Sequence, residues 1–179
     1  MPRLEPLAPP YEPDIAAELA RMMPPGVAPL ALFRTVAHNP RVLSRWRGGH
    51  LLDKGSISLR QREIVILRTT ARLGAEYEWG VHIAFFAEKA GFSAAERAAT
   101  VRAGPEAWAG AEAVLVRIAD ALVDEATLDD ALWAEAARHF APAQMIEILS
   151  LVGFYHLVSF VVNATGVARE PGAPGFPAV

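Results

Sequence analysis

Two glutamates and one histidine have the types and spacing needed for acid–base chemistry. In the stretch "GAEYEWGVHIAFF", residues 74–86, Glu78 precedes His82 by four residues, so a helix would place both on one face. Glu63 lies on the preceding helical segment, and a tight turn at Gly74 would fold it back to within about one helical turn of His82. A carboxylate beside an imidazole raises its pKa and fixes its tautomer. The pattern therefore predicts an acid–base group with His82 as the proton carrier.

Aromatic side chains near these residues in sequence, or on the long apolar helix, are candidates for the wall of a substrate pocket. The predicted substrate-binding residues are Tyr77, Trp79, Phe86, Tyr155 and His156, with Phe85 and Phe154 as further wall candidates. Arg68 or Arg72 could hold a substrate carboxylate. Helical spacing points both arginines away from Glu63, however, and we expect them in solvent.

Simpler interpretations exist for the same residues. Glutamate and histidine four residues apart also form solvated ion pairs on helix surfaces, and Glu76 fits the first turn of a helix, where an acid opposes the helix dipole. A metal site formed by Glu63, Glu78 and His82, with His156 as a further ligand, would be another use. Carboxylate metal sites in helical bundles use paired Glu-x-x-His motifs, which this chain lacks, so no metal site is predicted. His156 would equally suit a hydrogen-bonded core position.

Composition excludes several classes of function. The 179 residues carry 17 basic and 20 acidic side chains, a formal net charge of -3, and no basic block of the kind that binds nucleic acid or anionic membranes. Because the chain contains no cysteine, disulfides, thiolate metal sites and thiol redox catalysis are ruled out. No basic segment followed by an apolar run begins the chain, so we expect a cytoplasmic protein.

Helix start and stop signals predict an all-α fold in one domain. Ser58 with Gln61 and Ser93 with Glu96 form capping boxes, and Gly74 can end the first of the helices they open. Helices are expected at about 58–73, 76–90, 93–104, 111–126, 130–140 (opened by Thr127 with Asp130) and 142–166, with shorter helical pieces on either side of Pro40. The domain organisation expected is a proline-rich N-terminal extension (1–29), of which residues 1–13 should lie extended, a helical domain (30–170) and a loose tail (171–179).

The apolar stretch from Ala143 to Thr165 is long enough to cross a membrane. Polar residues spread along it, and the lack of an aromatic belt at both ends, favour a buried helix of a bundle instead. Such a helix carries more apolar surface than one small domain covers. We therefore expect a homo-oligomer without membrane contact.

Two motifs resemble a known family. The stretch "LRQREIVILRTTARLGAEYEWGVHIAFFAEKAGFS", residues 59–93, is similar to the signature hairpin of the carboxymuconolactone decarboxylase family, part of the superfamily that includes the alkylhydroperoxidase D proteins. The later "LVGFYHLVSFVVNATGV", residues 151–167, resembles the C-terminal helix of one branch. The resemblance implies an alkylhydroperoxidase D-like helical bundle with an antiparallel hairpin, assembled as dimers, trimers or hexamers.

The resemblance also assigns positions in the site. The acidic residue of the family's first helix falls on Glu63 and its histidine on His82. The two cysteines of the peroxidase branch fall on Ala75 and Glu78, so this chain lacks the groups for peroxide reduction. The implied function is a cofactor-independent lyase, acting on a small carboxylated or lactone substrate of aromatic-compound catabolism, in which Glu63 and Glu78 tune His82. The alternatives are a thiol-free oxidoreductase relative and a non-catalytic oligomeric binding protein.

Overall fold

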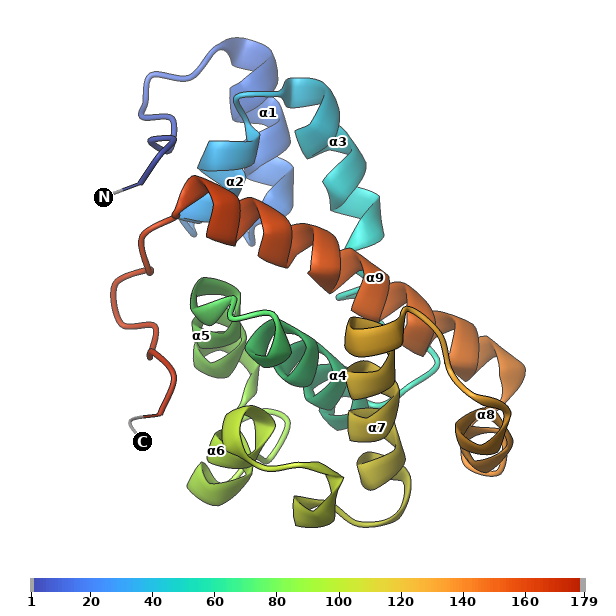
Figure 1. Cartoon of the computed structure of the whole chain (residues 1–179). Coiled ribbons are helices and arrows are strands. Elements are labelled where there is room, and N and C mark those ends of the chain that lie inside the picture. The colour runs from blue at the N-terminus through green and yellow to red at the C-terminus, as the bar shows by residue number, and fades with distance from the viewer. Residues whose placement is uncertain (1, 178–179) are drawn as a thin grey trace.

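The computed structural model describes residues 2–177, and all regular structure in that range is helical (Figure 1). The predicted all-α class is therefore confirmed. The elements, in chain order, are α1 (Pro13–Met22), α2 (Ala31–Val36), α3 (Pro40–Gly49), α4 (Leu59–Arg72), α5 (Glu76–Phe86), α6 (Ala94–Arg102), a short 3-10 turn (Pro105–Ala107), α7 (Gly110–Glu125), α8 (Asp130–Ala136) and α9 (Pro142–Thr165).

Helix α4 is the centre of the bundle and contacts α5, α6, α7 and α9. Its residues from Arg62 to Thr70 are all buried. The predicted capping box begins it, because Ser58 Oγ accepts from the amide of Gln61 at 3.1 Å and Gln61 Oε1 accepts from the amide of Ser58 at 2.9 Å. In Figure 1, α9 separates α1–α3 from the remaining helices.

The turn between α4 and α5 sets the register of the hairpin. Gly74 has a φ of +65°, a left-handed conformation that glycine adopts without a side-chain clash. The amide of Ala75 bonds to the carbonyl of Thr70 at 2.8 Å, and that of Gly74 to the carbonyl of Ala71 at 3.0 Å. These two bonds form a Schellman motif that reverses the chain. Helix α5 consequently folds back along α4.

The N-terminal extension, residues 1–29, contains a helix that follows its most proline-rich part. Residues 2–12 are not helical, but Pro13–Met22 form α1, which packs against α3 and buries Leu19 almost completely. Pro13 suits the first helical position, because its missing N–H has no acceptor there in any case. The extended part bonds to its own chain, where the Leu7 amide donates to the Arg34 carbonyl at 3.2 Å.

The C-terminal tail is not loose in its described part, residues 171–177. The amide of Phe176 donates to Glu76 Oε1 at 2.8 Å, and the Phe176 ring meets Trp79 edge-on. Two helix boundaries also differ from those predicted from the sequence. Helix α5 ends at Phe86, and the N-cap of α8 is Asp129, whose side chain accepts from the amide of Leu132 at 2.7 Å, in place of the expected Thr127.

Helix α9 combines a buried face with an exposed apolar one. The helix has 24 residues, and its most apolar window has a mean hydropathy of 1.9, values that would also suit a membrane span. Within the described residues, 44% of that window is buried. Leu151, Tyr155 and Ser159 are buried, and the helix contacts α4, α5 and α7. On the outer face Ile146 is 63% exposed and Phe160 is 60% exposed.

Candidate functional site

Four buried charged side chains form a row with alternating signs between α4 and α5. Arg62 Nε donates to Glu63 Oε1 at 2.9 Å, and Glu63 Oε2 lies 2.7 Å from His82 Nδ1. On the other side of the imidazole, His82 Nε2 lies 3.5 Å from Glu78 Oε1. The exposed fractions are 7% for Arg62, 0% for Glu63, 2% for His82 and 6% for Glu78. The solvated surface pair considered from sequence is therefore not what the structure contains.

The hairpin positions all four residues. The i,i+4 spacing on α5 places Glu78 and His82 on one face, and the reversal at Gly74 brings Glu63 of α4 opposite them. Arg62 is held from a second direction by the carbonyl of Leu52, which accepts from Nη1 at 2.7 Å. His82 is enclosed by two aromatic rings, with Tyr155 edge-on at 5.1 Å and Phe86 at 5.2 Å between ring centroids. The ring of His82 is thus fixed by contacts on every side.

Electrostatics keep His82 protonated at neutral pH. Burial is the largest influence and by itself lowers the pKa of His82. The negative charge and hydrogen bond of Glu63, with those of Glu78, outweigh it and raise the pKa to about 9. A protonated imidazole donates from both nitrogens, so His82 can donate to Glu63 and face Glu78 at the same time. The group therefore stores a proton at pH 7.

A small cavity lies at the Glu78 end of the row. It encloses about 30 Å³, room for about one water molecule. Its wall is formed mainly by apolar side chains from α1, α2, α3 and α9 together with Glu78 and His50: Met22, Leu32, Phe33, Trp46, His50, Leu52, Glu78, Phe154, Tyr155 and Val158. Glu78 Oε2 is buried and has no hydrogen-bond partner within the protein. The carboxylate that reaches this cavity is thus Glu78, while His82 lies behind it.

An unpartnered buried carboxylate oxygen is costly, because burial removes its water without replacing the hydrogen bonds. Native proteins keep such groups where a ligand or a reaction uses them. The neighbouring phenol of Tyr155 stays neutral, since burial and the negative charges of Glu78 and Glu63 raise its pKa well above the usual value. The cavity therefore combines one carboxylate with a neutral, largely aromatic wall.

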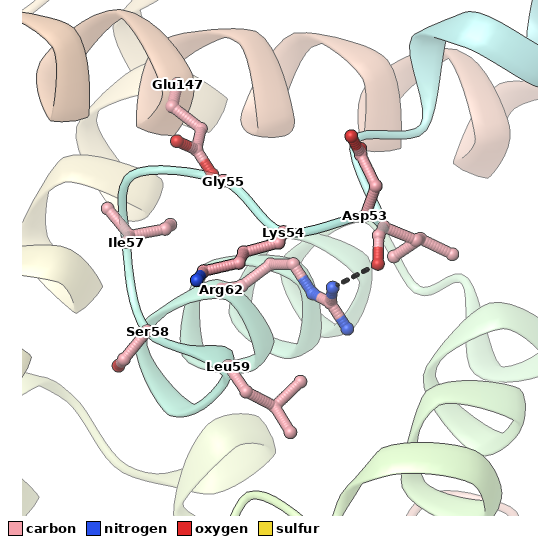
Figure 2. A pocket seen from close by; sticks show the side chains of 9 residues that line it. Asp53, Lys54, Gly55, Ile57, Ser58, Leu59, Arg62 and Glu147 are labelled. Carbon is pink, nitrogen blue, oxygen red and sulfur yellow. Dashed lines mark hydrogen bonds between the residues drawn. The ribbon is translucent and has the colours of Figure 1, made fainter.

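A second, outer cleft of about 250 Å³ lies on the Arg62 side (Figure 2). It is bordered by residues 52–59 of the α3–α4 loop, by Arg62 and by Glu147 of α9. Figure 2 shows the hydrogen bond by which Arg62 holds the loop backbone. Glu147 fixes the same loop, accepting from the Ser56 amide at 2.6 Å. Leu52 lines both the cleft and the inner cavity, so its side chain stands between them.

The structure brings together only part of the predicted site. Glu63, Glu78 and His82 converge, and Phe86 and Tyr155 contact the imidazole. The remaining predicted residues have other partners, described next.

Three predicted substrate-binding residues lie away from the cavity. Tyr77 Oη accepts from the amide of Leu32 at 3.0 Å and donates to Glu170 at 2.6 Å, which ties α5 to α2 and the C-terminal segment. Trp79 Nε1 donates to Thr100 of α6 at 2.9 Å. His156 bonds to a carbonyl of its own helix, at 3.1 Å from Val152 O, and borders a different, open depression. None of the three lines the inner cavity.

The arginine expectation was wrong for Arg68. Its side chain is buried, where Nε lies 2.6 Å and Nη2 2.9 Å from the two carboxylate oxygens of Asp120 on α7. Arg68 also donates to the carbonyls of Thr100 and Ala103. The sequence offered no sign of this, because Asp120 is 52 residues away in the chain. Arg68 fastens α7 to α4 and is not near the site.

Two residues of the site were not singled out from sequence. Arg62 directly precedes Glu63, and a buried arginine next to a buried acid on a helix is a signal that could have been used. His50 directly follows α3, precedes Leu51 with its φ of +51°, and lines the cavity together with Leu52. No local pattern predicts that placement. Across residues 2–177, no cluster of three or more His, Asp or Glu side chains has a geometry that could hold a metal ion.

Comparisons with known proteins give a family-model match and several similar folds. The model of the carboxymuconolactone decarboxylase family matches residues 39–122, which include α3 to α6 and most of α7. No curated protein matches the sequence.

Solved structures share the fold at low identity. An uncharacterized peroxidase-related protein from Silicibacter sp. TM1040 superposes with a TM-score of 0.79 at 16% identity, covering 96% of this chain and 93% of that one. The debrominase Bmp8 superposes in its apo form with a TM-score of 0.73 at 18% identity, covering 93% of this chain and 91% of that one. A cysteine-to-alanine variant of Bmp8 in complex with 2,3,4-tribromopyrrole superposes with a TM-score of 0.74 at 18% identity, again covering 93% of this chain and 91% of that one.

The expected alkylhydroperoxidase D-like bundle is therefore the observed fold. Together with the family-model match over residues 39–122, it confirms the resemblance of this cysteine-free chain to the carboxymuconolactone decarboxylase family.

Proposed function

We propose that this protein is a cofactor-independent lyase that decarboxylates a small carboxylated lactone or related ring compound of aromatic-compound catabolism. The observation that carries the proposal is the buried Glu63–His82–Glu78 group, whose last member, Glu78, lines a largely apolar cavity and has one oxygen, Oε2, without a hydrogen-bond partner in the described residues. Decarboxylation next to a conjugated carbonyl leaves an enolate, and the protein then has to supply only charge stabilisation and a proton.

The proton path follows the row of charges. The C–C bond to the carboxylate breaks, its electron pair moves into the conjugated carbonyl, and CO₂ leaves. His82 passes its Nε2 proton to the Glu78 carboxylate, whose Oε1 lies 3.5 Å away, and Glu78 gives that proton to the ring carbon. His82 then regains a proton from solvent. Glu63 keeps His82 charged between turnovers. In this proposal Glu78 touches the substrate and His82 is the proton store behind it.

The size of the cavity limits the substrate and requires motion. A ring of five or six atoms does not fit in about 30 Å³, so part of the wall has to move aside. Met22 of α1 is the most adaptable wall residue, because its unbranched side chain has several accessible rotamers. A bound small ring in the Bmp8 variant supports a compact, planar ligand for this fold. Arg62 at the outer cleft is the arginine best placed to attract the substrate's carboxylate.

The proposal is tested by incubating the protein with carboxymuconolactone and measuring the release of CO₂, which is monitored through the loss of the substrate's ultraviolet absorbance. Glu78→Gln should lower kcat by about 10² or more, the usual effect of losing a general acid or base, and His82→Gln should have a similar effect. Glu88→Gln is the matched control, because Glu88 is exposed and makes no ion pair with the described residues. Circular dichroism confirms that each variant is folded.

Two results would contradict the proposal. One is wild-type protein that releases no CO₂ from carboxymuconolactone or from a panel of small carboxylated lactones. The other is a folded Glu78→Gln variant that turns over as fast as Glu88→Gln.

A further inference from the structure

His50 is a titratable group of the inner cavity for which the proton path has no use. It follows the last residue of α3, is half-buried, and shares the cavity wall with Glu78 and Tyr155. The amide of Leu52 donates to His50 Nδ1 at 3.3 Å. A nitrogen that accepts a hydrogen bond carries no proton, so the neutral ring has its N–H on Nε2.

The surroundings keep His50 neutral. Burial is the main cause that lowers its pKa, and the positive charges of Arg62 on α4 and His82 on α5 act in the same direction. Asp53 in the loop and Glu78 on α5 oppose them without reversing the result. At neutral pH the cavity therefore holds one charged imidazolium behind Glu78 and one neutral imidazole in its wall.

His50 and Glu78 face the same cavity without bonding to each other. Glu78 Oε2 has no partner, and the Leu52 amide is the one hydrogen-bond partner of the His50 ring within the described part of the chain. A molecule in the cavity would thus have two polar wall residues to contact, the Glu78 carboxylate and the His50 ring, whose Nε2–H is not used by a hydrogen bond within the described residues. A neutral donor suits a carbonyl oxygen that becomes negative during reaction, because it stabilises that charge without adding another to an apolar site.

We propose that His50 Nε2 donates a hydrogen bond to the substrate's carbonyl oxygen, opposite Glu78, so that the substrate is a small cyclic enone or unsaturated lactone. This inference rests on the proposed function. In the decarboxylation the electron pair of the broken C–C bond ends on that oxygen as an enolate, His50 holds it, and Glu78 gives the proton to carbon. His50 keeps its own proton throughout.

The first measurement needs no substrate. Nitrogen-15 spectra of the histidine rings should show His50 neutral, with its proton on Nε2, from pH 7 to 8. The reverse tautomer, or a charged His50 at pH 7, would overturn the inference.

The second measurement uses 2-cyclohexenone as the bound probe and the infrared stretch of its carbonyl. Binding to the wild type should lower the carbonyl stretching frequency of the probe relative to its value in a water-free solvent. His50→Gln should keep part of this frequency shift, and His50→Phe should lose it. His139→Phe, a change at an exposed histidine, is the control. An unshifted carbonyl in wild type, or a full shift in His50→Phe, would overturn the donor role.

Kinetics separate this inference from the proposed reaction. With carboxymuconolactone, His50→Phe should lower kcat about 10²-fold, the usual effect of losing one oxyanion donor, and His50→Gln should recover part of it. If Glu78→Gln is inactive while His50→Phe is as fast as wild type, the donor role fails and the lyase stands. If wild type is inactive but His50 shifts the probe carbonyl, the reaction fails and the donor role stands.

Discussion

Replacing Glu63 by glutamine removes the negative charge that contributes most to keeping His82 protonated. The folded protein holds the pKa of His82 at about 9, against 6.5 for an unperturbed histidine. Between these values the native state binds a proton that the unfolded state has lost. The stabilisation is therefore fully present below pH 6.5 and is lost as the pH rises through 9. At about 1.4 kcal/mol for each pKa unit, this corresponds to about 3 kcal/mol.

Urea denaturation at pH 6.5, 8 and 9.5, followed by circular dichroism, measures this effect. The free energy of unfolding of wild type should fall by about 3 kcal/mol across that range. In Glu63→Gln the fall should be clearly smaller, because the largest influence that raises the pKa of His82 is gone and Glu78 remains to oppose the effect of burial. The exposed Glu88→Gln should keep the wild-type dependence. A wild-type stability that is flat or rising above pH 6.5, or an unchanged fall in Glu63→Gln, would refute the assignment.

Two further predictions concern the scaffold. Arg68→Ala should lower the free energy of unfolding by about 3 kcal/mol, because it leaves Asp120 with only Arg72 as an ion-pair partner and removes two hydrogen bonds to carbonyls of the α6 region. Arg45→Ala, at an exposed arginine, is the control and should change the free energy of unfolding little. Equal effects of the two changes in urea denaturation would contradict the role of Arg68. The exposed apolar face of α9 should pair copies of the chain, so the wild type should be an oligomer by light scattering at micromolar concentration. The double variant Ile146→Ser, Phe160→Ser should have a lower molar mass in the same measurement. A monomeric wild type would contradict this prediction.

Local signals in the sequence were sufficient for the hairpin. The capping box of Ser58 and Gln61 and the glycine at position 74 define where α4 begins, where it ends and where the chain reverses. Helical spacing then places Glu63 opposite His82 without knowledge of any other element. For that reason the pairing of these two residues could be predicted, along with the all-α class.

Contacts between distant segments could not be predicted in the same way. Leu19 enters the core only because α1 meets α3, and Tyr77 turns away from the cavity because Glu170 and Leu32 bind its hydroxyl. His50 lines the cavity through a loop in which Leu51 has a φ of +51°, a conformation with no local sequence signature for leucine. These features depend on packing partners from 20 to more than 90 residues away.

The protonation of His82 at neutral pH is the claim on which the proton path depends most directly. Nitrogen-15 spectra of the His82 ring between pH 6 and 10 measure it in the intact protein. The account predicts a ring with both nitrogens protonated at pH 7.5 that titrates at a pH of about 9. A His82 ring that is already neutral at pH 7.5, or that titrates at 6.5 like a solvated histidine, would contradict it.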